Sequence, residues 1–292
     1  YDGTSNHAER RWVEQNGFVA REFTVTWESA VALLDRGLPF TLVTTWPGRA
    51  HLQAVIGYDA ARGTLLVRDP SSSYRREYVG RDWLAEQAST GPRGMALVPR
   101  PQAALLDGLA LPDAELYDLR NEASLALEAH NRAQAEVAWQ TMVERAPNHY
   151  LTHLVRWSMA CYDGDHAAAL VCADRLLALF PNDSVLLARK VGHLMDRACR
   201  QQRLAIVEER CAQSDADPFF LVEYGDLLNE DGRERGRAVK VLRRSSRRWT
   251  SNDGLLSVLG SVFWTQRRFD LAMEHYRLAS CLSETSESHS QA

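Results

Sequence analysis

The first 160 residues of this 292-residue chain contain no cysteine. The five cysteines, Cys161, Cys172, Cys199, Cys211 and Cys281, all lie in the second half. Their odd number argues against a disulfide framework, and their spacing matches no Cys-x-x-Cys metal site. We therefore expect buried, apolar thiols in a reducing compartment and a cytoplasmic protein.

Long apolar runs and several ligand-binding motifs are also missing. No stretch of 18 apolar residues could form a transmembrane helix, and no signal peptide is recognisable. Without a glycine-rich phosphate loop we expect no nucleotide cofactor, and without a His-Glu-x-x-His motif we expect no metal site. The net charge of −4 and the pI near 6.2 argue against nucleic acid as a partner.

The residues that are present divide the chain into two halves of different periodicity. Residues 1–98 mix short helical and strand patterns, which predicts an α+β domain with a mainly antiparallel sheet. The expected helices cover 7–16, 27–36 and a turn at 83–87, and the expected strands cover 18–25, 40–46, 51–59, 64–69 and 95–98. Residues 99–112 contain three prolines and are expected to be a linker.

Helical periodicity dominates from residue 113 to 284, and a polar, disordered tail is expected at 285–292. Pro147 and Pro181 lie 34 residues apart, each after an amphipathic helix. This period resembles that of tetratricopeptide repeat proteins, which are all-α solenoids. We expect five helix pairs, at 115–146, 150–180, 184–213, 219–248 and 253–283, with irregular turns in the third and fourth.

Small residues support this interpretation, because they allow two helices to approach closely. The last pair matches best, with Leu259-Gly260, Phe263, Ala272, Tyr276 and Ala279 at the repeat positions. The other pairs match in part, through Ala135 and Trp139, Gly164 and Ala169, Gly192, and Tyr224-Gly225 with Ala238.

One strand–turn–strand segment of the first half places a histidine near a carboxylate. If the turn between residues 59 and 64 centres near Ala60-Ala61, residue i faces residue 122 minus i, and Asp69 is a diagonal neighbour of His51. Side chains alternate along a strand, so both point to one face. An imidazole beside a carboxylate is an oriented general base.

Four motifs in order resemble the C-terminal part of a C39-like cysteine peptidase domain, a variant of the papain fold. They are Gly37-Leu38-Pro39-Phe40 before a strand, His51, Gly57-Tyr58-Asp59 and Asp69-Pro70. The resemblance covers roughly residues 7–100. It implies a cysteine nucleophile near the domain start, a histidine base, an aspartate that orients it, and a glutamine in the oxyanion hole. Carried over to this sequence, His51 is the base and Asp69 the orienting residue.

The chain departs from that family at the nucleophile, because no cysteine precedes His51. We expect the nucleophile-bearing segment to precede Tyr1 in the gene, or the domain to be degenerate. As written, the chain should have no thiol-peptidase activity. The resemblance thus implies a cysteine peptidase fused to a peptide-binding array, and the alternative is a non-catalytic interaction scaffold.

A helical array of this kind presents a concave surface to a peptide or protein partner. Arg189, His193, Asp226, Asn229 and Trp264 are the residues that we expect on it. A basic stretch in the fourth pair comprises Arg233, Arg235, Arg237, Lys240, Arg243, Arg244, Arg247 and Arg248. Because Glu230, Asp231 and Glu234 lie beside it, a solvated helix face is favoured over an RNA- or phosphate-binding face.

Overall fold

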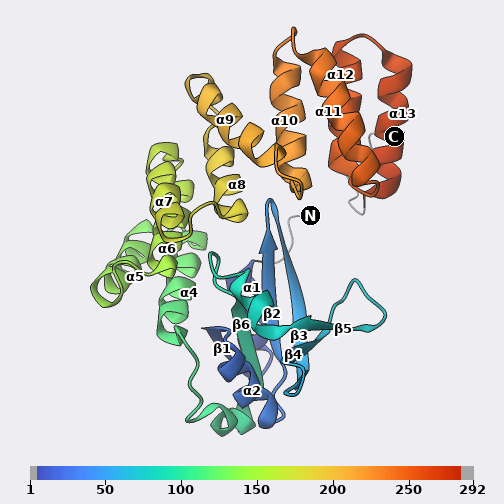
Figure 1. Ribbon diagram of the computed structural model, residues 1–292. Helices are drawn as coiled ribbons and strands as arrows, with labels where there is room; N and C mark the ends of the chain where they lie inside the picture. Colours follow the sequence, from blue (N-terminus) through green and yellow to red (C-terminus); the bar gives the residue numbers. More distant parts are fainter. Residues whose placement is uncertain (1–4, 284–292) are drawn as a thin grey trace. The chain divides into compact units, whose positions relative to one another are not determined.

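A computed structural model describes residues 5–283 (Figure 1). Backbone contacts divide the chain into a first unit, residues 2–187, and a second unit, residues 188–292. The first unit contains the sheet, the first two helix pairs and the start of the next helix, and the second contains the rest of that helix and the later ones. The predicted tail at 285–292 lies outside the described residues.

The first unit begins with an α+β domain built on one six-stranded sheet. Its elements are α1 (Asn6–Gln15), β1 (Phe18–Thr24), α2 (Trp27–Asp35), β2 (Phe40–Trp46), β3 (Arg49–Asp59), β4 (Thr64–Arg68), β5 (Arg75–Val79), α3 (Gly80–Ala85) and β6 (Arg93–Pro99). The strand order is β1-β6-β2-β3-β4-β5, and every neighbouring pair is antiparallel. The predicted α+β class with an antiparallel sheet is confirmed.

The two faces of the sheet are covered by different helices. On one face, Leu33 of α2 and Trp83 of α3 join the buried core with strand residues such as Phe40 and Val55. Alternate side chains of β1 point to the other face, where Ala20 packs with Val13 of α1 and with Met95. Thr26 is the N-cap residue of α2 and forms a capping box with Ser29, in which the Thr26 hydroxyl accepts from the Ser29 amide at 3.1 Å.

Local boundaries differ from the sequence prediction in four places. The strand β5 is absent from the prediction because Arg75-Arg76-Glu77 shows no apolar alternation, although Tyr78 packs on the core. The predicted turn at 83–87 is a helix at Gly80–Ala85, and the last strand is longer, at Arg93–Pro99. Strand β3 also starts two residues before His51.

The register of the β3–β4 hairpin follows the prediction where it matters for His51. In the pairs Ala54–Arg68 and Val55–Val67 the two residue numbers add to 122, as predicted for residues that face each other. A bulge between Val55 and Gly57 shifts the pairs nearer the turn by one residue. The side-chain alternation is therefore as predicted on the side of the bulge that carries His51 and Asp69.

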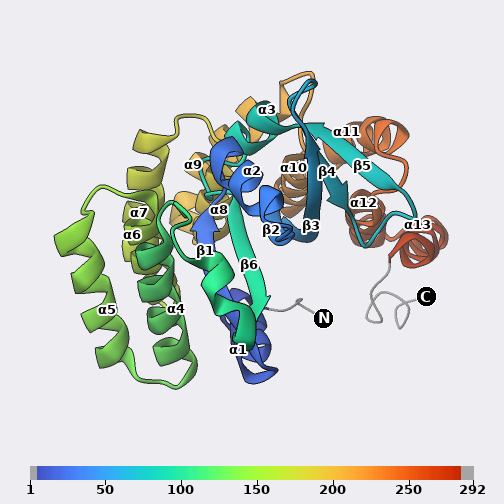
Figure 2. The ribbon, with the colours of Figure 1, turned by 90° about the horizontal axis from the view of Figure 1, so that it is seen from below.

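Paired helices follow the sheet (Figures 1 and 2). They are α4 (Ala114–Glu128) with α5 (Arg132–Arg145), α6 (Tyr150–Tyr162) with α7 (His166–Leu179), α8 (Ser184–His193) with α9 (Arg200–Cys211), α10 (Pro218–Glu230) with α11 (Arg235–Arg248), and α12 (Asp253–Thr265) with α13 (Phe269–Leu282). Each predicted pair is present. Two 3₁₀ helices, η1 (Arg100–Leu106) and η2 (Arg197–Cys199), lie in the predicted linker and in the irregular third turn.

Some predicted small residues do mark close helix packing. A Cβ on Gly225 would lie 2.6 Å from the Leu242 side chain, and one on Gly260 would lie 2.8 Å from the Tyr276 ring. Gly192 is different, because a Cβ there would meet nothing within 4 Å. Its assignment as a packing glycine is wrong. Gly164 also has open space, and its φ of +68° shows that it serves the left-handed turn instead.

Among residues 5–283, none of the helices has both the length and the apolar character that crossing a membrane requires.

Candidate functional site

His51 and Asp69 lie side by side on the core face of the sheet. His51 is the third residue of β3 and is paired with Thr44 of β2, whereas Asp69 directly follows β4. The imidazole Nε2 lies 2.8 Å from Asp69 Oδ1, which is hydrogen-bond distance. The predicted proximity of these two side chains is observed.

The Asp69 carboxylate is held on both oxygens. Oδ1 accepts from the Ser71 amide at 2.8 Å as well as contacting His51, and Oδ2 lies 3.2 Å from a guanidinium nitrogen of Arg76. Only 3% of the Asp69 side chain is exposed. The hydrogen bond with His51, followed by that from Ser71, lowers the pKa of Asp69 below its usual value. The carboxylate is therefore ionised and fixed in place at neutral pH.

Arg76 is a site residue that sequence reasoning missed, because it belongs to the unpredicted strand β5. It lies opposite Val67 in the ladder, and its guanidinium donates to the Tyr78 hydroxyl at 3.4 Å. The Tyr78 ring stacks on Trp83, with 4.2 Å between the ring centroids. Arg76 thus connects Asp69 to a rigid aromatic pair of the core.

A second network holds the backbone of His51. The buried Thr44 hydroxyl donates to the His51 carbonyl oxygen at 3.4 Å and accepts from the Gln53 amide nitrogen at 2.9 Å. Gln53 is buried on the same face, two residues after His51, and its Oε1 has no hydrogen-bond partner within the described part of the chain. A Gln-Thr pair of this kind restricts the position of the imidazole from the main-chain side.

The arrangement leaves one imidazole nitrogen available for proton transfer. About 29% of the His51 side chain is exposed, and Nδ1 has no hydrogen-bond partner among residues 5–283. A carboxylate on Nε2 and a free Nδ1 are what a general base needs. No thiol accompanies it in residues 1–88, because all five cysteines are at position 161 or later.

The predicted peptide-binding residues lie on first helices of successive pairs in the second unit. Arg189 and His193 are one turn apart on α8, Asp226 and Asn229 are on α10, and Trp264 is on α12. The Thr265 hydroxyl donates to Asn229 Oδ1 at 2.8 Å, which links α12 to α10. Trp264 is 53% exposed and packs edge-on against Phe269. Burial, with the Glu223 carboxylate nearby, raises the pKa of Asp226 to about 6.

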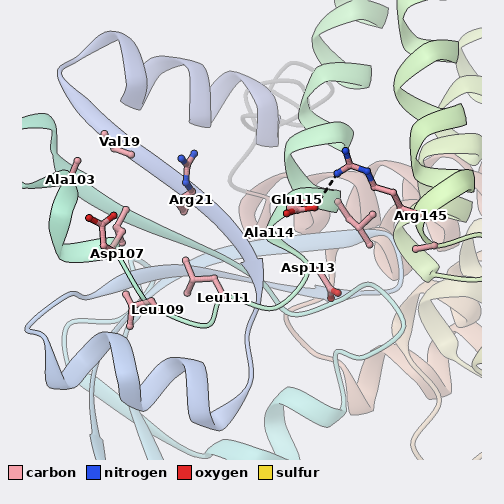
Figure 3. A pocket seen from close by; sticks show the side chains of 13 residues that line it. Val19, Arg21, Ala103, Asp107, Leu109, Leu111, Asp113, Ala114, Glu115 and Arg145 are labelled. Carbon is pink, nitrogen blue, oxygen red and sulfur yellow. Dashed lines mark hydrogen bonds and ion pairs between the residues drawn. The ribbon is translucent and has the colours of Figure 1, made fainter.

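A pocket of about 630 Å³ in the first unit is shown in Figure 3, and neither His51 nor Asp69 is among its lining residues. Its walls come from Val19 and Arg21 of β1, from residues 103–116, and from the end of α5. Glu115 and Arg145 form an ion pair of 3.0 Å at one side. None of the described residues that line the pocket is a histidine or a cysteine, so it offers neither a second imidazole nor a thiol.

No group of three or more His, Cys, Asp or Glu side chains among the described residues is placed to hold a metal ion. None of the five cysteines, which all lie within the described residues, forms a disulfide bond.

Comparison with known proteins separates the two parts of the chain. Residues 1–88 match the profile of the family described as "Peptidase_C39 like family". No curated protein sequence is similar enough to count as a match.

Several solved structures are similar to the chain, at low identity. PilW, a type IV pilus biogenesis factor, has 14% identity and a TM-score of 0.46, with 60% of this chain and 81% of that chain covered. PilF of Pseudomonas aeruginosa has 15% identity and a TM-score of 0.46, covering 60% and 80%. YrrB, a TPR protein with an unusual peptide-binding site, has 11% identity and a TM-score of 0.42, covering 59% and 90%. Residues 1–88 thus match a C39-like peptidase family, and the paired helices follow this matched segment in the chain.

Proposed function

We propose that the first domain carries the histidine–carboxylate half of a thiol peptidase site, and that the helical region holds the peptide on which it acts. His51 is the general base, and Asp69 orients its imidazole. The observation that carries the proposal is the 2.8 Å contact of Nε2 with a carboxylate oxygen, together with the free Nδ1. The match of residues 1–88 to a C39-like peptidase family supports it.

In this proposal, Nδ1 takes the proton of a thiol, and the resulting thiolate attacks the peptide carbonyl. The imidazolium then returns the proton to the leaving amine, while Asp69 stabilises its positive charge. The thiol belongs to a segment outside residues 1–88. None of the five cysteines at positions 161–281 belongs to the proposed site, so residues 1–292 on their own should turn over no peptide.

The test uses the protein of natural length, isolated from its own cells. Intact mass and N-terminal sequencing identify any cysteine beyond those of residues 1–292, and a peptidyl chloromethyl ketone then labels an activated thiol. We expect one labelled cysteine, with labelling slowed at least about 100-fold in His51→Ala. His166→Ala, a histidine of α7 outside the site, is the matched control and should label at the normal rate. A labelling rate in His51→Ala equal to that of the unmodified protein would overturn the proposal.

A second candidate function is a non-catalytic interaction scaffold whose first domain keeps the peptidase-like fold without the activity. The absence of cysteine from residues 1–160 favours it. The same experiment separates the two candidates. A natural-length protein without any further cysteine, and with no labelling that depends on His51, means a scaffold.

On either proposal the helical region binds a peptide or protein segment, on the surface that carries Asn229 and Trp264. The exposed Trp264 ring and the polar groups of α10 suit such a ligand. For the peptidase, a bound segment raises the concentration of substrate at the site. Trp264→Ala should weaken capture of the partner without changing the rate of His51-dependent labelling.

A further inference from the structure

A second pocket, of about 610 Å³, lies entirely within the second unit, between the end of α9 and the helices α10 and α11. Its size is in the range of small-molecule sites. One part of the wall is apolar, with Leu221 of α10 and Val241 of α11. The basic part of the wall comes from α11, which contributes Arg244 and Arg248, one turn apart.

The positive charge in this pocket is not balanced from within it. None of the described lining residues is acidic. Arg248 donates to the carbonyl oxygen of Ser214, which fixes its side chain but does not neutralise it. Arg244 is exposed and has no partner among the described residues. The Tyr224 hydroxyl in the wall donates to Glu208, and that carboxylate is paired with Arg237 at 3.2 Å.

A buried hydroxyl adds a neutral hydrogen-bond donor. Ser245 lies between the two arginines in sequence, is 7% exposed and lines the pocket, and its side chain has no hydrogen-bond partner among the described residues. Two guanidinium groups and a hydroxyl above an apolar wall suit an acid group on a short apolar body. Cys211 also lines the pocket, but burial raises the pKa of its thiol to about 12, so it is a packing group.

We propose that this pocket binds a small amphipathic anion, with its carboxylate or phosphate held by Arg244, Arg248 and Ser245 and its apolar part against Leu221 and Val241. The site is independent of the His51–Asp69 pair. Of the basic stretch between Arg233 and Arg248, it singles out two arginines.

The experiment measures binding of four probes to residues 1–292 by isothermal titration: hexanoate, hexyl phosphate, inorganic phosphate and hexanol. We expect hexanoate or hexyl phosphate to bind at one site, and the stronger of the two identifies the acid group. Arg244→Gln should weaken that binding at least about tenfold. Arg247→Gln removes the same charge from the same helix outside the pocket, and it should leave the affinity unchanged.

Two further measurements keep the result unambiguous. Circular dichroism confirms that both variants are folded, and Ser245→Ala should reduce affinity with little effect on stability. Equal loss of binding in Arg244→Gln and Arg247→Gln would mean a diffuse basic surface and would overturn the proposal. So would inorganic phosphate binding as tightly as hexyl phosphate, because the apolar wall would then have no role. Absence of binding for all four probes would also reject it.

Discussion

The hydroxyl group of Tyr150 lies against Gly91, in the space that a Cβ atom on residue 91 would occupy. Tyr150 begins α6, and Gly91 precedes β6, so this contact joins a helix pair to the α+β domain within the first unit. The same hydroxyl is 2.7 Å from that of Thr24 and 3.2 Å from that of Tyr117. Thr24 also donates to Asp113 at 2.5 Å. The two parts of this unit are therefore packed as one body.

Gly91→Ala should lower the free energy of unfolding of the first unit. Residue 91 has a φ of +65°, which disfavours any Cβ, and the new methyl group would overlap Tyr150. Gly63→Ala is the matched control, because its φ is +66° but a Cβ there meets nothing within 4 Å. We expect backbone strain of about 1–2 kcal/mol in both variants and a further loss of about 1–3 kcal/mol at Gly91 alone. Urea unfolding measures the difference, and equal losses would contradict the contact.

His51 should be present mainly as the tautomer that carries its proton on Nε2. A carboxylate is an acceptor, so the nitrogen that contacts Asp69 must donate. The ¹⁵N chemical shifts of the imidazole at neutral pH distinguish Nε2–H from Nδ1–H. In Asp69→Ala this preference should disappear. An Nδ1–H tautomer in the unmodified protein would remove the base that the proposed mechanism requires.

Asp69 should also make stability depend on pH in the acid range. Its pKa is lowered in the folded state, so the folded protein binds fewer protons than the unfolded chain as the pH approaches 3.8. The stabilisation is thus fully present above that value and is lost as the pH falls through the lower, folded pKa. In Asp69→Asn this contribution should be missing at pH 7. Denaturant unfolding from pH 7 to pH 3 should therefore show a smaller acid-dependent loss in the variant, and parallel curves would contradict the prediction.

The proximity of His51 and Asp69 could be predicted because it depends on local pairing. The turn centres between Ala61 and Arg62, slightly beyond the predicted centre, and the bulge at Val55–Gly57 restores the predicted register for the pairs that position His51. Helix pairs could be predicted for a similar reason, since each is a local unit with a strong period. The same pattern of small and apolar residues recurs in each helix pair, so one pair with a clear pattern indicates the others.

The remaining site residues depend on contacts that sequence does not encode locally. Arg76 reaches Asp69 from β5, a strand whose pattern is mostly charged and which is recognisable only by its place in the sheet. The contact of Gly91 with Tyr150 joins residues far apart in the chain. Gly192 shows the opposite error, because a glycine at a repeat position need not lie at a close approach.

Gly260→Ala should destabilise the last helix pair. A Cβ on residue 260 would lie 2.8 Å from the Tyr276 ring, which is itself hydrogen-bonded to Ser261 at 3.1 Å and cannot move freely. We expect a loss of about 1–3 kcal/mol in the free energy of unfolding. Gly236→Ala on α11 is the control, because it has open space and should gain up to about 1 kcal/mol from helix propensity. A loss in both variants would show that packing against Tyr276 is not the cause.

Asp226→Asn should stabilise the protein at neutral pH, although it removes a predicted peptide-binding residue. Burial raises the pKa of Asp226 to about 6 in the folded state, from an ordinary value of 3.8. The folded protein therefore holds a proton that the unfolded chain has lost between these two values, and the free energy of unfolding falls as the pH rises through this window. The asparagine variant has no such titration, so its advantage should be absent at pH 3.5 and complete above pH 7. Thermal unfolding of both proteins at the two pH values measures it.

If Asp226→Asn also weakens peptide capture, the ionised carboxylate is retained at this position for binding, at a cost in stability. If capture is unchanged, Asp226 belongs to the packing of α10 and not to the binding surface.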